Sequence, residues 1–227
     1  MLKKTLIIGA SGYIGSKLFS VYQQQYPELI GTGFNTETEY LTHFALGKSK
    51  LSELKLNKQQ YQSAIITAAM TNIAEINNNQ AAAYRINVTA TIQLIRDLHD
   101  LGLHIIFISS DNVFAGEHGQ YGTNSIANPV SEYGKQKLAV ERALAEICDK
   151  YTVLRLAKVV GTKVGENTIF NDIANQLQQQ TVALAADDLI FNPTYIGDIV
   201  DIIQDIQQRQ LYGIFNFCNP EIWSRYT

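Results

Sequence analysis

The chain has 227 residues, 46% hydrophobic and 17% charged, so its apolar content is sufficient for the core of one large α/β domain or two small ones. Its formal net charge of -3 excludes a broad basic surface of the kind that holds nucleic acid. No apolar run approaches the ~20 residues of a membrane-spanning helix, so we expect neither a membrane segment nor a membrane partner.

The N-terminal segment predicts a strand, a glycine turn and a helix. A short apolar run at 6–8 ends at Gly9, and residues 13–25 then carry apolar side chains at helical spacing. Glycines interrupt the opening apolar run and no cleavage-like region follows. A buried first strand therefore explains this run better than a signal peptide does.

Strands and helices alternate along the rest of the chain. We expect strands at 29–34, 43–46, 63–68, 103–108 and 152–156, and helices at 80–101 and 133–147. The apolar run at 103–108 is typical of a strand that is buried on both faces of a parallel sheet. The alternation predicts a Rossmann-like, doubly wound parallel α/β sheet in a single domain over 1–227.

The glycines between the first strand and the first helix predict a dinucleotide-binding turn. Gly9 allows the tight turn, Gly12 lets the backbone approach a pyrophosphate, and Gly15 permits close helix packing. The start of the helix offers unpaired N–H groups to the anion. The predicted cofactor site therefore includes Gly9, Ser11, Gly12, Tyr13, Ile14 and Gly15.

The end of the second strand bears on the choice between NAD and NADP. An acid there binds the ribose diol of NAD, whereas a basic residue faces the extra phosphate of NADP. This chain has Asn35 in that region, and we assign Asn35 to the cofactor site. The missing acid favours NADP, while Glu37 keeps NAD open.

Tyr133 and Lys137 lie one helical turn apart at the start of a predicted helix. Such a pair shares one face, roughly 6 Å apart along the axis. A free tyrosine titrates near pH ~10, so proton transfer near neutral pH needs a stabilised phenolate, which a nearby ammonium group favours. The pair predicts acid/base chemistry.

The glycine turn, the run Ser109-Ser110-Asp111 and the pair Tyr133 and Lys137, in this order, resemble the extended short-chain dehydrogenase/reductase family. The run 108–114, I-S-S-D-N-V-F, is similar to the I-S-T-D-Y-V-F of its dTDP-4-dehydrorhamnose reductase branch. Further matches to that branch are Asn87-Val88, Asn128-Pro129, Leu154-Arg155, Asn192-Pro193-Thr194 and Asp198. The resemblance extends from Lys4 to about Trp223.

This resemblance implies an NAD(P)-dependent oxidoreductase that reduces a keto group on a nucleotide-linked sugar. Tyr133 is expected to protonate the carbonyl oxygen, Ser110 to hydrogen-bond it, and Lys137 to hold the nicotinamide ribose and lower the tyrosine pKa. The remaining cofactor residues are expected to be Ala68, Ala69 and Asn87, together with Tyr133 and Lys137. The expected substrate residues are Asp111, Asn112, Val113, Phe114 and Lys158.

The chain departs from the branch at several positions. Relatives usually have an aspartate near Leu46-Gly47, a tyrosine at the position of Asn112 and a threonine at that of Ser110. Family members also continue well past Thr227. We therefore expect either a truncated chain or a reduced substrate lobe, built from about 161–195 and 218–227.

Several assignments have structural alternatives. Ser109 and Asp111 serve equally well to satisfy backbone groups at a strand end. Asn87 reads either as a buried, hydrogen-bonded amide or as part of a proton relay. Arg155 and Lys158 could meet a substrate phosphate or form ion pairs.

Two other functions stay open. A non-catalytic, cofactor-binding regulatory subunit, like the beta subunit of methionine adenosyltransferase, would resemble the same branch. A nucleotide-sugar epimerase or dehydratase would hold NAD throughout its reaction. A homodimer is an expectation from the family.

The cysteines and histidines indicate neither a disulfide nor a metal site. Cys148 and Cys218 show no C-x-x-C or metal-like spacing, so we expect reduced thiols in a cytoplasmic protein. We assign no metal, because the histidines have no metal-ligand spacing. They are His43, His99, His104 and His118.

Overall fold

The structure is a computed structural model that describes residues 4–26, 29–34, 40–57, 60–163, 166, 168–179 and 190–224. Its centre is a seven-stranded sheet of order β3-β2-β1-β4-β5-β6-β9, in which every neighbouring pair is parallel. The strands are β1 (Lys4–Ile8), β2 (Gly31–Gly33), β3 (Leu41–His43), β4 (Tyr61–Ile66), β5 (His104–Ser110), β6 (Tyr151–Leu156) and β9 (Gly213–Phe217). The strand order reverses between β1 and β4, which confirms the predicted doubly wound fold.

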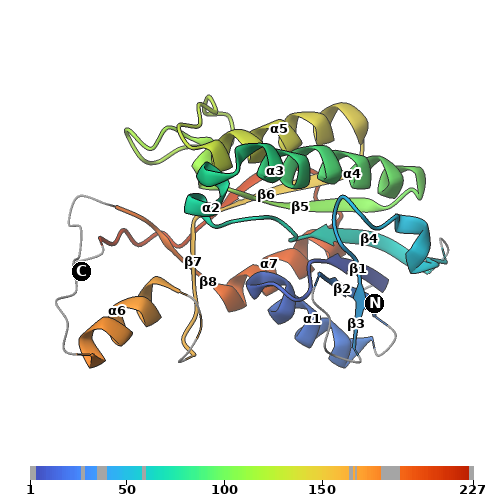
Figure 1. Cartoon of the computed structure of the whole chain (residues 1–227), viewed down its shortest axis with the longest axis horizontal. Helices are drawn as coiled ribbons and strands as arrows, with labels where there is room; N and C mark the ends of the chain where they lie inside the picture. Colours follow the sequence, from blue (N-terminus) through green and yellow to red (C-terminus); the bar gives the residue numbers. More distant parts are fainter. Residues whose placement is uncertain are drawn as a thin grey trace.

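Helices cover both faces of the sheet (Figure 1). One face packs against α1 (Tyr13–Gln25) and α7 (Ile196–Arg209), and the other against α3 (Gln80–Tyr84), α4 (Thr91–Asp100) and α5 (Glu132–Ile147). Shorter helical elements are η1 (Leu51–Leu54), α2 (Ile73–Asn78), the π-helical η2 (Arg85–Ala90) and η3 (Asp111–Val113). A separate parallel pair, β7 (Lys158–Val160) with β8 (Pro193–Tyr195), lies near α6 (Ile169–Gln178).

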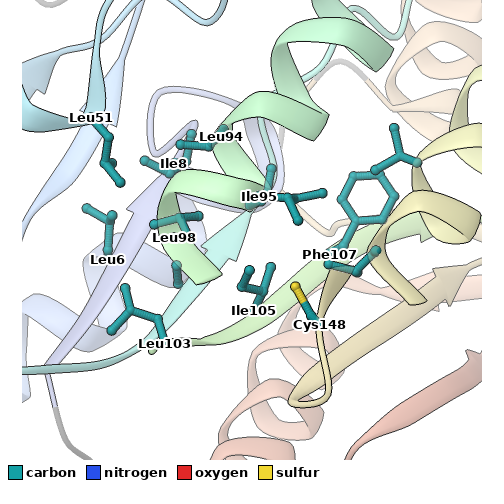
Figure 2. Packing of buried hydrophobic residues seen from close by; sticks show 14 of the residues in the cluster. Leu6, Ile8, Leu51, Leu94, Ile95, Leu98, Leu103, Ile105, Phe107 and Cys148 are labelled. Atoms are coloured by element: carbon teal, nitrogen blue, oxygen red, sulfur yellow. The ribbon is translucent and has the colours of Figure 1, made fainter. Parts of the chain in front are cut away.

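The strands send alternate side chains into two apolar cores. Leu6 and Ile8 of β1 pack on the α4 and α5 side, where Figure 2 shows Ile8 among Leu94, Ile95 and Leu98 of α4. Ile7, between them, belongs to the other core with α1 and α7. Each fully buried aliphatic side chain contributes about 1.5–3 kcal/mol. The continuous apolar runs in the sequence follow from this two-sided burial.

Polar bonds also join α7 to the first strand. The Gln207 side chain donates to Thr5 Oγ1 at 2.8 Å and accepts a hydrogen bond from the Tyr22 hydroxyl of α1. Hydrogen bonds therefore connect β1, α1 and α7, although Thr5 and Gln207 are far apart in the sequence.

The predicted third strand at 43–46 is wrong in its position. β3 ends at His43, which pairs with Gly33 at the end of the equally short β2. Phe44 and Ala45 are buried beyond the strand, at 6% and 4% exposure. Their apolar character reflects core packing, not strand pairing.

The predicted helix at 80–101 is confirmed, but it is not uniform. Its middle is the π-helical η2, between α3 and α4. A π segment widens the helix locally and is frequent at functional positions. In the described part of the chain, no helix combines the length and apolar character that crossing a bilayer requires.

Candidate active site

The carboxyl ends of β1, β4 and β5 lie next to one another at one edge of the sheet. Ile8 is in register with Ile66, and Ile66 with Phe107. The glycine turn follows β1, the Ala68-Ala69 segment follows β4, and Ser110 ends β5. Ligands bind at this edge and at the switch point in doubly wound sheets.

Close packing explains two of the three glycines in the turn. Gly9 has φ +96°, and a Cβ there would lie 2.5 Å from the Ala68 nitrogen. A Cβ on Gly15 would lie 2.1 Å from the Gly9 carbonyl oxygen. The turn, the first helix and the end of β4 are therefore in backbone contact, which holds Ala68 against the glycine turn.

Gly12 has a different role, because the space around it is open. Gly12 is the N-cap of α1, no side-chain hydrogen bond caps this helix end, and no acid occupies its first turn. A Cβ here would meet only the Gly9 oxygen, at 3.4 Å, and Ser11 and Gly12 are exposed. The N-terminus of α1 therefore presents uncapped N–H groups to open space, an arrangement that suits a pyrophosphate.

Tyr13 directs its side chain away from this turn toward a later segment. Its hydroxyl donates to Glu166 Oε2 at 3.0 Å. Burial first, and then Glu166, raise the pKa of Tyr13 to about 12. A Cβ on Gly161 would lie 2.1 Å from the Tyr13 hydroxyl, so the chain after β7 lies close against α1. Sequence reasoning missed Glu166, which belongs to no recognisable motif.

Of the two alternatives for Asn87, the structure supports the buried, hydrogen-bonded amide. Its Oδ1 accepts from Met70 N at 2.7 Å, and its Nδ2 donates to Met70 O at 2.9 Å and to Gln136 Oε1 at 2.8 Å. Both residues are nearly inaccessible, with Asn87 at 5% and Gln136 at 3% exposure. The two amides connect the segment after β4 to helix α5. Gln136 belongs to no motif of its own, so sequence reasoning did not single it out.

Ser110, Asp111 and Asn112 form one hydrogen-bonded group. Ser110 Oγ donates to Asp111 Oδ1 at 3.0 Å and accepts from Asn112 N at 3.2 Å and Nδ2 at 3.0 Å. Desolvation raises the pKa of the Asp111 carboxyl, against the opposing effects of these hydrogen bonds and of Lys158. Asp111 as a whole is exposed to solvent, although its carboxyl group is partly desolvated, as expected for a residue at the rim of a site.

Gly134 brings Tyr133 to this group. A Cβ on Gly134 would lie 2.0 Å from the Asn112 carbonyl oxygen, so only glycine lets α5 begin against η3. Ser131 Oγ accepts from Gly134 N at 3.0 Å and caps the helix. The half-buried Tyr133 then lies near Asp111. Burial first, and then the Asp111 charge, raise the pKa of Tyr133 to about 12.

Lys137 is buried beneath Tyr133. Its Nζ donates to the Ile108 carbonyl oxygen at 2.8 Å and lies 5.6 Å from the centre of the Tyr133 ring. Burial lowers the pKa of Lys137 to about 8, against Glu141, which raises it. The expected lowering of the Tyr133 pKa by Lys137 is not found, since burial of the phenol dominates and the ammonium group is engaged by a carbonyl.

A buried ion pair supports the floor of the site. Arg155 Nη2 lies 2.6 Å from Glu141 Oε2, and Ser109 Oγ donates to Glu141 Oε1 at 2.5 Å. Arg155 and Glu141 are only 5% and 3% exposed. Arg155 therefore has the ion-pair role, not the phosphate-binding one, and Ser109 is structural. Lys158, by contrast, is exposed beside Asp111.

Val113 and Phe114 lie in a small core with Leu138. Val113 is 0% and Phe114 6% exposed, and the Phe114 ring stacks on Tyr121 at 4.6 Å between centroids. Their side chains shape the site from beneath and offer little surface to a ligand.

The structure thus brings Ser110, Asp111, Asn112, Tyr133 and Lys137 together near the glycine turn. Asn35, assigned to the cofactor, lies outside the described residues. Within the described residues, no cluster of three or more His, Cys, Asp or Glu side chains could hold a metal ion. Cys148 is buried and Cys218 exposed, and neither forms a disulfide.

Curated relatives of two kinds are similar to this chain. Methionine adenosyltransferase 2 subunit beta from Danio rerio is 25% identical over 232 residues, covering 99% of this chain and 71% of the relative. A dTDP-4-dehydrorhamnose reductase from Aggregatibacter actinomycetemcomitans is 27% identical over 242 residues, covering 99% of this chain and 76% of the relative. One kind is named for a subunit and the other for an enzyme.

Solved structures share the fold. A hypothetical dTDP-4-dehydrorhamnose reductase from Sulfolobus tokodaii has a TM-score of 0.86 at 25% identity, covering 98% of this chain and 78% of its own. The Bacillus anthracis dTDP-4-dehydrorhamnose reductase in complex with NADP has a TM-score of 0.78 at 24% identity, covering 99% and 77%. MoeE5 in complex with UDP-glucose and NAD has a TM-score of 0.86 at 20% identity, covering 98% and 78%.

The RmlD substrate binding domain family matches residues 3–227, nearly the whole chain. This match confirms the resemblance to the dTDP-4-dehydrorhamnose reductase branch. The chain belongs to the RmlD substrate binding domain family.

Proposed function

We propose that this protein is an NAD(P)-dependent oxidoreductase that reduces a keto group on a nucleotide-linked sugar. The observation that carries the proposal is that Ser110, with Tyr133 close to Asp111, lies at the same carboxyl edge of the sheet as a glycine turn suited to a pyrophosphate. The family match and the reductase relative support the same reaction.

The glycine turn, Asn35 and the Ala68-Ala69 segment would hold the dinucleotide. The buried Asn87, assigned to the cofactor from the sequence, would support that segment through its bonds to Met70. A bound nicotinamide supplies the hydride. NAD and NADP each occur in complexes of proteins with this fold. We favour NADP, because the end of the second strand has no acid directly after it.

Tyr133 is suited to donate a proton. With its pKa raised to about 12, the phenol is protonated at neutral pH, which is the form that can donate to a carbonyl oxygen. A catalytic acid works best with a pKa near the operating pH, so the proposed reaction requires the Tyr133 pKa to fall when cofactor and substrate bind. Ser110 has one hydroxyl proton, which now points to Asp111 Oδ1. To hydrogen-bond a substrate oxygen, this hydroxyl must rotate away from Asp111.

Lys137 would position the cofactor and not act as the acid. Its ammonium group has three donors, and Ile108 O accepts from one of them. The others would hold ribose hydroxyls next to Tyr133. Asp111, Asn112 and the exposed Lys158 would line the substrate side.

A substrate lobe that includes 161–195 and 218–227 is part of the proposal. Phe191 and Trp223 form an antiparallel bridge, and Asn192 Nδ2 donates to two carbonyls of the last segment at 3.0 and 2.7 Å. These bonds support one lobe made from both segments. A homodimer and a cytoplasmic location stay predictions, which light scattering and cell fractionation would test.

NADPH consumption with a panel of dTDP-, UDP-, GDP- and CDP-linked keto sugars tests the function. We expect one nucleotide class to support turnover, and Tyr133→Phe to reduce kcat by about 10²–10⁴ because the proton donor is lost. The affinity of the variant for NADPH should stay within twofold of the wild type. Equal turnover of the two proteins would remove Tyr133 from the mechanism.

A regulatory subunit is the second candidate, favoured by the similarity to methionine adenosyltransferase 2 subunit beta. This function predicts cofactor binding without turnover on any sugar of the panel, together with a partner enzyme recovered by affinity purification. NAD that copurifies, with turnover but no net NADPH consumption, would instead indicate an epimerase or dehydratase.

A further inference from the structure

A groove of about 410 Å³ lies between the segment that follows β3 and the helix formed by η2 and α4. None of the residues assigned to the active site lines it. Its buried apolar floor comes from Phe44, Leu51 and Leu94, which are 6%, 6% and 3% exposed. Its volume lies in the range of small-molecule sites, about 300–1,000 Å³.

The wall after β3 is a preformed turn. Lys48 N and Ser49 N both donate to the Ala45 carbonyl at 2.8 Å, and Ser49 Oγ accepts from Ala45 N at 3.0 Å. Gly47, at φ +81°, approaches the opposite wall, where a Cβ on it would lie 3.2 Å from Ala90 Cβ. Hydrogen bonds within the chain therefore fix the shape of this wall.

The groove is strongly basic in an acidic protein. Lys48 and Lys50 line one wall and Arg85 and Arg96 the other, against a single acid, Asp97. Asp97 Oδ1 already accepts from Gln93 Nε2 at 2.9 Å. Within the described residues, no acid forms an ion pair with any of the four basic side chains. A concave surface with unneutralised positive charge attracts anions.

The spacing of the basic side chains indicates an elongated anion. Arg85, at the start of the π-helical η2, and Arg96, near the end of α4, both line the groove from positions eleven residues apart on the same continuous helix. A single inorganic ion would reach only one of them, whereas a nucleotide spans such a distance. Thr89 and Gln93 lie between the two arginines and offer hydrogen bonds.

We propose that this groove binds a phosphate-bearing small molecule of nucleotide size, with the four basic side chains contacting its phosphates. The proposed function assigns nothing to these residues; the proposal rests on that function where the phosphate belongs to NADP and goes beyond it where the phosphate belongs to a separate nucleotide. The phosphate could belong to the adenosine end of NADP, because β3 pairs with β2, or to a separate nucleotide. Both sources share the same chemistry.

Calorimetric titration of the full chain with ATP, in the presence of saturating NAD, tests the groove directly. NAD lacks the extra phosphate and occupies the dinucleotide site, so ATP cannot bind there. We expect ATP to bind the wild type, and Arg85→Gln with Arg96→Gln, or Lys48→Gln with Lys50→Gln, to weaken binding at least tenfold. Parallel titrations compare NADP with NAD.

The matched control is Arg142→Gln with Lys150→Gln, which removes two exposed charges outside the groove. Tenfold weaker ATP binding in the groove variants alone supports a separate nucleotide. Weaker NADP binding with unchanged NAD binding supports the dinucleotide phosphate. Groove and control variants that do not differ with ATP or NADP would overturn the proposal. Failure to bind NAD would count only against the proposed function, because the ATP titration can be repeated without it.

Discussion

Burial sets the protonation of the two residues that the proposed reaction depends on. It raises the pKa of Tyr133 to about 12 and lowers that of Lys137 to about 8, because each charged form loses hydration. At neutral pH the phenol is therefore neutral and the ammonium group charged. The protein thus places the neutral Tyr133 phenol, a possible proton donor, next to the buried Lys137 ammonium group, whose loss of hydration costs free energy.

The low pKa of Lys137 has a consequence for stability. Its unfolded pKa is about 10.4, so between pH 8 and 10 the unfolded chain binds more protons than the folded one, and stability rises with pH. We expect the free energy of unfolding of the wild type, relative to Lys137→Met, to increase by about 2 kcal/mol from pH 7.5 to 9.5. Urea unfolding at several pH values measures this difference. A flat difference would mean that the ammonium group is hydrated.

The residues that sequence reasoning missed act through packing. Gly134 received no role from the sequence, yet its missing Cβ is what allows α5 to lie against the Asn112 carbonyl. Gln136 gave no pattern at all, because a buried amide pair is visible only when two distant helices are placed together. Tyr133, Lys137 and Ser110 could be found, since they lie in a recognisable order along the chain.

At the scale of elements, one face of α5 carries both the proposed catalytic residues and the residue that anchors the helix to the sheet. Tyr133, Lys137 and Glu141 follow at intervals of four residues. Ser109 of β5 and Arg155 of β6 are in register with each other, and both bond to Glu141. The helix is thus anchored to two neighbouring strands directly below the proposed reaction centre.

Removal of one member of this ion pair should destabilise the protein strongly. Arg155→Met leaves the Glu141 carboxylate buried without its cation, and we expect a loss of about 3–5 kcal/mol in the free energy of unfolding. Adding Glu141→Gln should recover most of that loss. Arg209→Met, which breaks an exposed pair with Asp205, is the control and should cost less than about 1 kcal/mol. Similar losses in Arg155→Met and in the control would contradict the burial of the pair.

Elements without a long apolar run of their own gave the strongest departures from the sequence-based expectation. The short strands β7, β8 and β9 carry no long apolar run, and β7 pairs with a strand more than thirty residues later in the chain. The π-helical η2 arises where Asn87 must reach Met70, a requirement that helical periodicity does not encode. The strands β1, β4, β5 and β6 could be predicted because apolar side chains cover both of their faces, and α1, α4 and α5 because their apolar residues recur at helical spacing. Helix α7 was not among the predicted helices.

At the scale of the whole molecule, the alternation of strands and helices, together with the glycine turn after the first strand, predicted the doubly wound parallel sheet. Seven parallel strands with helices on both faces leave one edge for ligands, and the proposed cofactor spans the switch point between β1 and β4. A ligand at this position contacts segments from both halves of the sheet. Its binding should therefore stabilise the entire fold.

Cofactor binding should appear as a concentration-dependent rise in Tm. A ligand that binds only the native state adds about 2.7 kcal/mol at a concentration of 100 Kd, by mass action. We expect NADP to shift Tm more than NAD at equal concentration. Gly12→Val places a side chain where the pyrophosphate would lie, and should abolish the shift while leaving the Tm without ligand nearly unchanged. An unaltered shift in this variant would place the dinucleotide elsewhere.

Thr5 in the first strand is bonded to Gln207 in α7, 202 residues later in the chain. A ribosome makes the polypeptide from its N-terminus, so the outer face of β1 emerges long before the helix that covers it. Until α7 has left the exit tunnel, Ile7 and its apolar neighbours lack part of their final cover and are open to aggregation or to chaperones. The core around Ile7 therefore cannot be completed before α7 has been synthesised.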